Sequence, residues 1–297
     1  MFNKLLVPLD GTPEAAMALP LARTMAQACS GQLVLVRVTS AEYRRERPKA
    51  KEYLASVAAN LANTRLVVST EVRSGDVPSE ILGAIRDHQA DLVVMATHGR
   101  KGLQRAVMGS VAEVVLTRGT APVLLVRPGG NPTTGIRTLL VPVDGTPGGA
   151  LALASATAVA RTAGARIILL EIVVPIPRWS FALAPPVPLR WDEEARDGAQ
   201  AYVDALAARL RVADVEAEGR ALIGDVAPTI VSVADEVGAD LIVMSTRALV
   251  GATRAVIGST GDAVVRTARR PVLLVRRTVP AAQSPAEETA VELALVR

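Results

Sequence analysis

Short apolar runs alternate along the chain with longer segments in which apolar and polar residues are mixed. In the first part of the sequence these runs fall near residues 4–9, 32–38, 65–72, 91–96 and 122–126. They are apolar throughout rather than alternating with polar residues, which predicts parallel strands buried on both faces. The segments between them have helical composition, and Pro13 and Pro78 suit a first helical turn. We therefore expect helices at about 13–29, 50–62, 78–88 and 110–118.

The same order of motifs occurs twice along the chain. LLVPLDGTP at 5–13 returns as LLVPVDGTP at 139–147, DLVVMATHG at 91–99 returns as DLIVMSTRA at 240–248, and PVLLVR closes both copies at 122–127 and 271–276. The offset between the copies grows from 134 residues (139 minus 5) to 149 residues (240 minus 91), so the second copy contains an insertion. This repeat predicts an α/β fold of two tandem doubly wound domains, each a five-stranded parallel sheet of order 3-2-1-4-5 with helices on both faces.

The repeat also gives domain boundaries. We expect domain 1 at 1–128, a linker rich in glycine and proline at 129–136, domain 2 at 137–277 and a C-terminal tail at 278–297. The insertion lies near PIPRWSFALAPPVPLRW at 175–191, where prolines exclude a regular helix through most of the segment. A loop packed on its own domain is favoured there over a partner-binding flap or a lid. For the tail, disorder and a weak docking contact are both open.

Composition removes several classes of function. Cys29 is the only cysteine in a chain of 297 residues, which excludes an internal disulfide and a cysteine metal cluster. Two Trp, three Tyr and two Phe provide few stacking platforms, and the net charge of +4 is small, so we expect no nucleic acid as a partner. No apolar run reaches the roughly 18 residues of a membrane span, and the N-terminus has no leader pattern. The expected location is therefore the cytoplasm, without membrane binding.

A loop with glycine and hydroxyl residues follows the apolar run at 91–96. Gly99 is followed after nine residues by Gly109 and Ser110, which lead into the helical segment VAEVVLTR. The free N–H groups and the dipole at a helix N-terminus favour an anion such as phosphate. Neither a Walker A motif nor a GxGxxG motif after the first strand is present. Serine is also a common helix cap, and Asp10-Gly11 is a common turn, so each feature has a purely structural interpretation as well.

With these motifs the sequence closely resembles the universal stress protein family in its tandem two-domain form, over about 4–127 and 137–276. ATP-binding members of that family carry a G-x2-G-x9-G-[S/T] loop after the fourth strand and an aspartate at the end of the first. The matching positions here are Ala96, Gly99, Gly109 and Ser110, together with Asp10, so the first glycine of the motif is replaced.

The resemblance assigns roles to these positions. It implies that Asp10 and Val38 border an adenosine, and that Gly99, Gly109 and Ser110 hold the phosphates. His98 and Arg100 lie next to Gly99 in the same loop, although the family motif does not require them.

The second copy departs further from the motif. Both early glycines are replaced, and the corresponding positions are Ser245, Ala248, Gly258 and Ser259, with Asp144 and Ile172. A side chain at Ala248 would project where the backbone should approach a phosphate closely. Domain 1 is therefore expected to hold the better site.

The resemblance implies a function as well. We expect an ATP-binding protein, with or without Mg²⁺ or Mn²⁺, that acts in a stress response through nucleotide-dependent conformation or association. No catalytic base is evident beside the loop, which leaves at most slow ATP hydrolysis, and the HxGH and SGGxDS signatures of adenylylating enzymes are absent. In the family the last strand mediates dimer contacts, which implies a homo-oligomer or an internal pseudo-dimer through the PVLLVR edge strands, and a protein partner of unknown identity. The alternative is a nucleotide-free structural or partner-binding stress protein with degenerate loops.

Overall fold

The computed structural model describes residues 2–40, 46–62, 66–97, 108–130, 135–145, 147–175, 191–246 and 258–276. Several predicted features lie outside this part of the chain. They are His98, Gly99, Arg100, Ala248, the tail at 278–297, residues 131–134 of the linker and residues 176–190 of the insertion.

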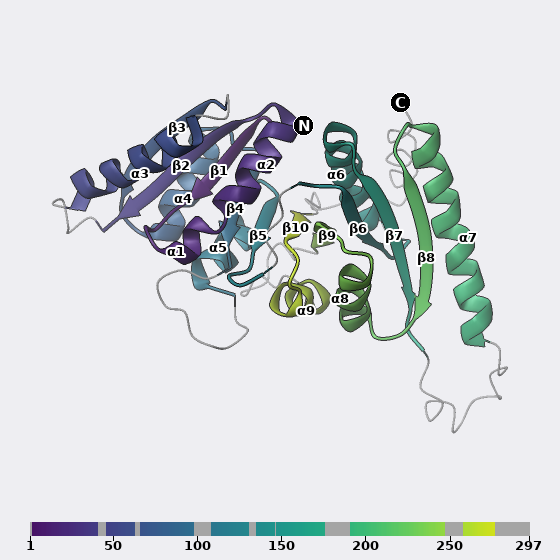
Figure 1. Ribbon diagram of the computed structural model, residues 1–297. Helices are drawn as coiled ribbons and strands as arrows, with labels where there is room; N and C mark the ends of the chain where they lie inside the picture. The colour runs from purple at the N-terminus through teal and green to yellow at the C-terminus, as the bar shows by residue number, and fades with distance from the viewer. Residues whose placement is uncertain are drawn as a thin grey trace, which may run out of the picture.

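Strands and helices alternate through both halves of the chain (Figure 1). The first half contains β1 (Lys4–Pro8), α1 (Pro13–Ala16), α2 (Leu19–Cys29), β2 (Gln32–Thr39), α3 (Glu46–Ala62), β3 (Val68–Ser74), α4 (Val77–Asp87), β4 (Leu92–Ala96), α5 (Ser110–Arg118) and β5 (Val123–Val126). The second half contains β6 (Thr138–Val143), α6 (Pro147–Ala163), β7 (Arg166–Val173), α7 (Trp191–Val212), β8 (Ala217–Ile223), α8 (Val226–Glu236), β9 (Leu241–Thr246), α9 (Ser259–Thr267) and β10 (Val272–Arg276).

Each half has the predicted topology. The strand order is β3-β2-β1-β4-β5 in the first half and β8-β7-β6-β9-β10 in the second, and the pairs within each half are parallel. Alternate residues of one strand enter different layers: Leu33 and Leu35 of β2 pack in one hydrophobic cluster, and Val34 and Val36 in the other. The predicted doubly wound α/β fold is therefore confirmed.

The two halves share one sheet. Strands β5 and β10, formed by the PVLLVR segments, pair antiparallel with Leu124 opposite Leu273, and a ten-stranded sheet results (Figure 1). Arginines at the ends of these strands cross the junction: Arg127 donates to the carbonyl of Arg266 at 2.7 Å, and Arg276 donates to the carbonyl of Gly119 at 2.5 Å. Both hydrophobic clusters contain residues from both halves, so each core layer is continuous across the junction.

Two details of the first half differ from the sequence prediction. The helix expected at 13–29 is divided into α1 and α2, because Pro20 has no N–H to donate to the preceding turn. The helix expected at 50–62 begins earlier, at Glu46, and the strand expected at 65–72 is shifted to Val68–Ser74. This strand is not buried on both faces: it lies at the edge of the sheet and carries exposed polar residues.

Local signals fix the helix starts near the candidate site. The Thr12 hydroxyl accepts from the N–H of Ala15 at the start of α1, and the Asp76 carboxylate accepts from the N–H of Ser79 at the start of α4. Such caps satisfy N–H groups that a helix leaves unpaired. Within the described ranges, no helix is long and apolar enough to cross a membrane.

Candidate functional site

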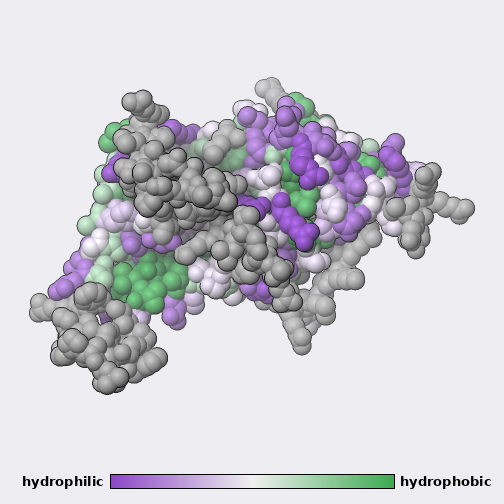
Figure 2. Space-filling view, turned by 180° about the vertical axis from the view of Figure 1, so that it is seen from behind, coloured by the Kyte–Doolittle hydropathy of each residue, from purple (hydrophilic) through white to green (hydrophobic). Residues whose placement is uncertain are grey.

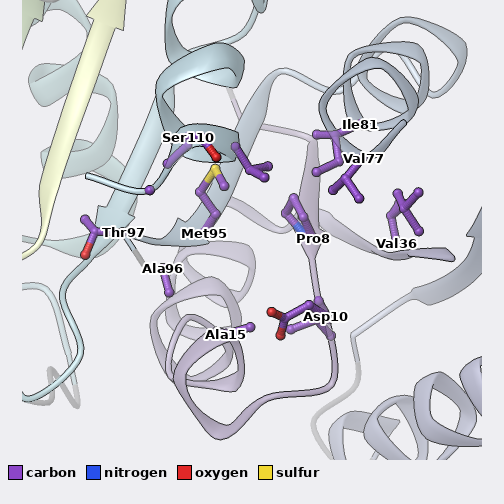
Figure 3. A pocket seen from close by; sticks show the side chains of 15 residues that line it. Pro8, Asp10, Ala15, Val36, Val77, Ile81, Met95, Ala96, Thr97 and Ser110 are labelled. Atoms are coloured by element: carbon purple, nitrogen blue, oxygen red, sulfur yellow. The ribbon is translucent and has the colours of Figure 1, made fainter. Parts of the chain in front are cut away.

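A cavity of about 530 Å³ lies in the first half at the carboxyl ends of its central strands (Figure 3). Strand order reverses between the neighbouring strands β1 and β4, because the chain continues from β1 to β2 on one side and from β4 to β5 on the other. Ligands in doubly wound folds bind at this reversal. Residues of β1, β2 and β4 and of helices α1, α4 and α5 line the cavity: Pro8, Leu9, Asp10, Ala15, Val36, Val38, Val77, Ile81, Met95, Ala96, Thr97, Gly109, Ser110, Val111 and Ala112.

Five residues predicted from the sequence line this one cavity: Asp10, Val38, Ala96, Gly109 and Ser110. They come from the ends of three strands and the start of a helix, which are distant in sequence. The fold therefore brings both predicted parts of the site, the aspartate after the first strand and the helix entry after the fourth, to one place.

The sequence prediction missed the apolar wall of the cavity. Val36 on β2, Val77 and Ile81 on α4 and Met95 on β4 line it beside Val38. Figure 3 shows Val36, Val77 and Ile81 grouped on one side, apart from Ser110. Val77 and Ile81 are one helical turn apart, and Val36 and Val38 share a strand face, so the two periodicities could have indicated them.

The polar end of the cavity is the N-terminus of α5. Gly109 precedes this helix in an extended conformation with φ −64° and ψ 145°, and no side chain of the described residues caps it. The Gly109 N–H donates to the carbonyl of Thr97 at 2.8 Å, which ties the helix entry to the end of β4. An uncapped helix start presents N–H groups and a partial positive charge, a combination that suits an anionic group.

Asp10 is held in a fixed turn at the opposite edge of the cavity. Its Oδ1 accepts from the Thr12 N–H at 2.9 Å and from the Thr12 hydroxyl at 2.6 Å. Figure 3 shows its carboxylate near Ala15 at the start of α1. The turn therefore presents a carboxylate of defined position, which can accept hydrogen bonds from the hydroxyl or amino groups of a ligand.

The corresponding positions of the second half differ in part. Asp144 is exposed whereas Asp10 is half-buried, but Ser259 and Ile172 have the same burial as Ser110 and Val38. Gly258, before α9, has φ +86°, whereas Gly109 is extended, so the chain enters the last helix of each half differently. Ser245 lies in β9, and the loop that follows this strand, residues 247–257, lies outside the described residues.

The carboxyl ends of the strands are also more apolar in the second half than in the first. Val174, Leu222 and Ile223 follow or end the paired strands β7 and β8 and are 55%, 37% and 40% exposed. Figure 2, seen from behind, shows a hydrophobic area on the half that Figure 1 draws on the right. The register places Ser74 of the first half where Ile223 stands in the second. The carboxyl ends of the strands therefore favour polar contacts at Ser74 in the first half and apolar contacts at Ile223 in the second.

The fold and the cavity together define a class: a tandem doubly wound α/β protein with a small-molecule-sized cavity at the switch point of one half. The sequence pattern of the Universal stress protein family matches residues 1–127 and again residues 135–276. The chain belongs to the universal stress protein family.

Two relatives each match less than half of this chain, and a solved structure matches most of it. A universal stress protein of Methanocaldococcus jannaschii is 28% identical over 141 residues, which cover 43% of this chain and 83% of the relative. Universal stress protein YxiE of Bacillus subtilis is 28% identical over 148 residues, covering 43% of this chain and all of the relative. The crystal structure of a universal stress protein from Archaeoglobus fulgidus superposes with a TM-score of 0.73 at 19% identity, over 93% of this chain and 99% of that one. At this identity the likeness shows a shared fold across both halves.

Proposed function

We propose that the first half binds an adenine nucleotide, ATP in the first place, in the cavity between Asp10 and the N-terminus of α5. The observation that carries the proposal is the joining of an apolar wall and an uncapped helix start in one cavity. The base would lie against Val36, Val38 and Ile81, and the phosphates would lie at Gly109 and Ser110. A volume of about 530 Å³ falls within the usual range of small-ligand pockets.

Mg²⁺ or Mn²⁺ would accompany the phosphates, since such ions are commonly held by substrate oxygens and water with few protein ligands. We propose that the bound nucleotide acts by changing the conformation or association of the protein in a stress response, rather than by rapid turnover. Helix α5 supports this: its first residue lines the cavity, and Gly119, which follows its last residue, accepts a hydrogen bond from Arg276 of the other half. A nucleotide at Ser110 would therefore act on an element that contacts the junction.

The experiment is isothermal titration with Mg-ATP on protein checked for co-purified nucleotide. Ser110→Asp adds a carboxylate at the proposed phosphate position, and Ser259→Asp is the matched control at the start of α9. Both serines are exposed at the first position of a helix, where an acidic residue favours the helix. Loss of binding in Ser110→Asp would therefore reflect repulsion of the ligand and not unfolding.

We expect one site of about micromolar affinity, roughly 8 kcal/mol, that weakens at least about tenfold in Ser110→Asp and is unchanged in Ser259→Asp. Absence of heat and of bound nucleotide in the wild type would refute nucleotide binding. That outcome would favour the second candidate, a nucleotide-free structural or partner-binding protein, which the replaced motif glycines and the apolar strand ends of the second half support.

A further inference from the structure

Two residues of opposite charge occupy the same place in the two halves. In the first half β1 and β2 pair with Pro8 opposite Val36, and in the second β6 and β7 pair with Pro142 opposite Leu170. The next residues along β2 and β7 are Arg37 and Glu171. Both lie next to the loop that follows the first strand of their half, where Asp10 and Asp144 stand.

Arg37 lies directly beneath this loop in the first half. A Cβ atom placed on Gly11 would be 3.0 Å from both terminal nitrogens of the Arg37 guanidinium, so the guanidinium packs against the residue that follows Asp10. The same group stands 5.1 Å from the centre of the Tyr53 ring on α3. Arg37 belongs to the opposite face of β2 from the cavity-lining Val36 and Val38. It therefore places a positive charge behind the site without occupying the cavity.

Glu171 gives the second half the opposite charge. Its Oε2 atom is buried and has no hydrogen-bond partner among the residues that the structure describes. Burial, and then the nearby charge of Asp144, raise the pKa of the Glu171 carboxyl. The second half therefore combines two carboxylates at the place where the first half combines one carboxylate with a guanidinium.

We propose that these two residues, Arg37 and Glu171, determine which half of the protein accepts an anionic nucleotide. The inference rests on the proposed function and adds a cause of specificity to it. In the first half Arg37 offsets the charge of Asp10 and supports the loop, so that the helix dipole of α5 dominates the field at the phosphates. In the second half Glu171 and Asp144 add their repulsion, and a polyphosphate is rejected.

The test in the first half uses Arg37→Lys, Arg37→Met and Arg37→Glu, titrated with Mg-ATP at low and at high salt and with uncharged adenosine. Lysine keeps the charge, methionine keeps most of the stem, and glutamate is the residue of the second half. With ATP at low salt we expect near wild-type affinity for Arg37→Lys, a loss of about threefold for Arg37→Met, and a loss of about tenfold for Arg37→Glu. The Arg37→Glu loss should shrink at about 0.5 M salt, because salt screens charge interactions.

Adenosine separates the electrostatic role from a merely structural one. If Arg37 acts through charge, adenosine affinity should change by less than about twofold in all three variants. Equal losses for ATP and adenosine, or a loss that salt does not reduce, would overturn the inference and assign Arg37 to loop packing. Wild-type protein that binds neither ligand would instead refute the proposed function, so the two failures are distinguishable.

The test in the second half uses Glu171→Arg in the Ser110→Asp background, where the first site is weakened. We expect Mg-ATP binding to be clearly tighter with Glu171→Arg added than in Ser110→Asp alone, where only the weakened first site remains. The added binding should again weaken with salt. If Glu171→Arg folds with an unchanged circular dichroism spectrum and binds Mg-ATP no more tightly than Ser110→Asp alone, charge at this position does not decide specificity in the second half.

Discussion

The junction between the halves gives a prediction whose size follows from the structure. Arg276 ends β10 and donates from Nη1 to the carbonyl of Gly119, the residue that follows the last turn of α5 in the other half. A hydrogen bond from a charged donor contributes about 1.5–3 kcal/mol, and a cation at a helix C-terminus adds about 0.3–1 kcal/mol. Within the described part of the chain the Nε atom of Arg276 is buried without a partner, which offsets part of this gain. We therefore expect Arg276→Met to cost about 1–2 kcal/mol of unfolding free energy.

The assay is urea denaturation followed by circular dichroism, with Arg276→Lys and Arg127→Met measured in parallel. Arg127 is the matched residue of the first half and donates to the carbonyl of Arg266 at 2.7 Å, so its loss should cost a similar amount. Lysine keeps the charge with a shorter reach and should recover about half of the loss. The corresponding fall in midpoint temperature is roughly 2–4 °C per kcal/mol. An ordinary surface substitution changes the unfolding free energy by up to about 0.5 kcal/mol. A change below this size in Arg276→Met would show that the contact does not hold the halves together.

Two further predictions concern the loops after the first strands. Gly11 and Gly145 have φ +86° and +66°, but a Cβ at Gly11 would meet the Arg37 guanidinium at 3.0 Å, whereas a Cβ at Gly145 would meet no atom of the described residues within 4 Å. Gly145→Ala should therefore cost about 1–2 kcal/mol from backbone strain alone, and Gly11→Ala more than that; equal losses in chemical denaturation would contradict the contact. The raised pKa of Glu171 means that its carboxyl holds a proton more tightly in the folded state than in the unfolded state. The protonated carboxyl therefore favours folding at low pH, and this contribution to the unfolding free energy is lost as the pH rises through the folded pKa. Glu171→Gln should stabilise the protein at pH 7.5 but not near pH 4, and an equal gain at both pH values would exclude titration of this carboxyl as the cause.

Much of the fold could be predicted from the sequence, because its determinants are local or repeated. Continuous apolar runs such as LLV in β1 and VVM in β4 reflect burial on both faces of a parallel sheet, and the repeated DGTP motif indicates two copies. The errors have local causes too. Pro20 divides the helix expected at 13–29, and the polar residues Ser69 and Glu71 indicate an edge strand at β3.

The candidate site could be predicted only in part. Asp10 and Ser110 were found because the carboxyl ends of parallel strands meet at one edge, so that residues far apart in sequence converge there. The contribution of Val77 and Ile81 depends on how α4 docks on the sheet, which periodicity alone does not give. The relation between Arg37 and Glu171 required the register of two strand pairs, since each residue by itself is an ordinary charged position in a strand.

The junction explains how the two halves can differ in charge at equivalent positions. The second half contributes β10 and Arg276 to the first through backbone pairing and a carbonyl contact, and neither depends on a ligand in the second half. Without this pairing β5 would be an edge strand with unpaired backbone groups. A substitution such as Glu171 in place of arginine changes the field at one loop but leaves the β5–β10 register and both core layers intact. The same architecture can therefore keep a ligand cavity in one half while the other half supplies structure to it. We expect the unfolding free-energy changes of a Glu171 variant and of Arg276→Met, measured by urea denaturation, to add in the double variant.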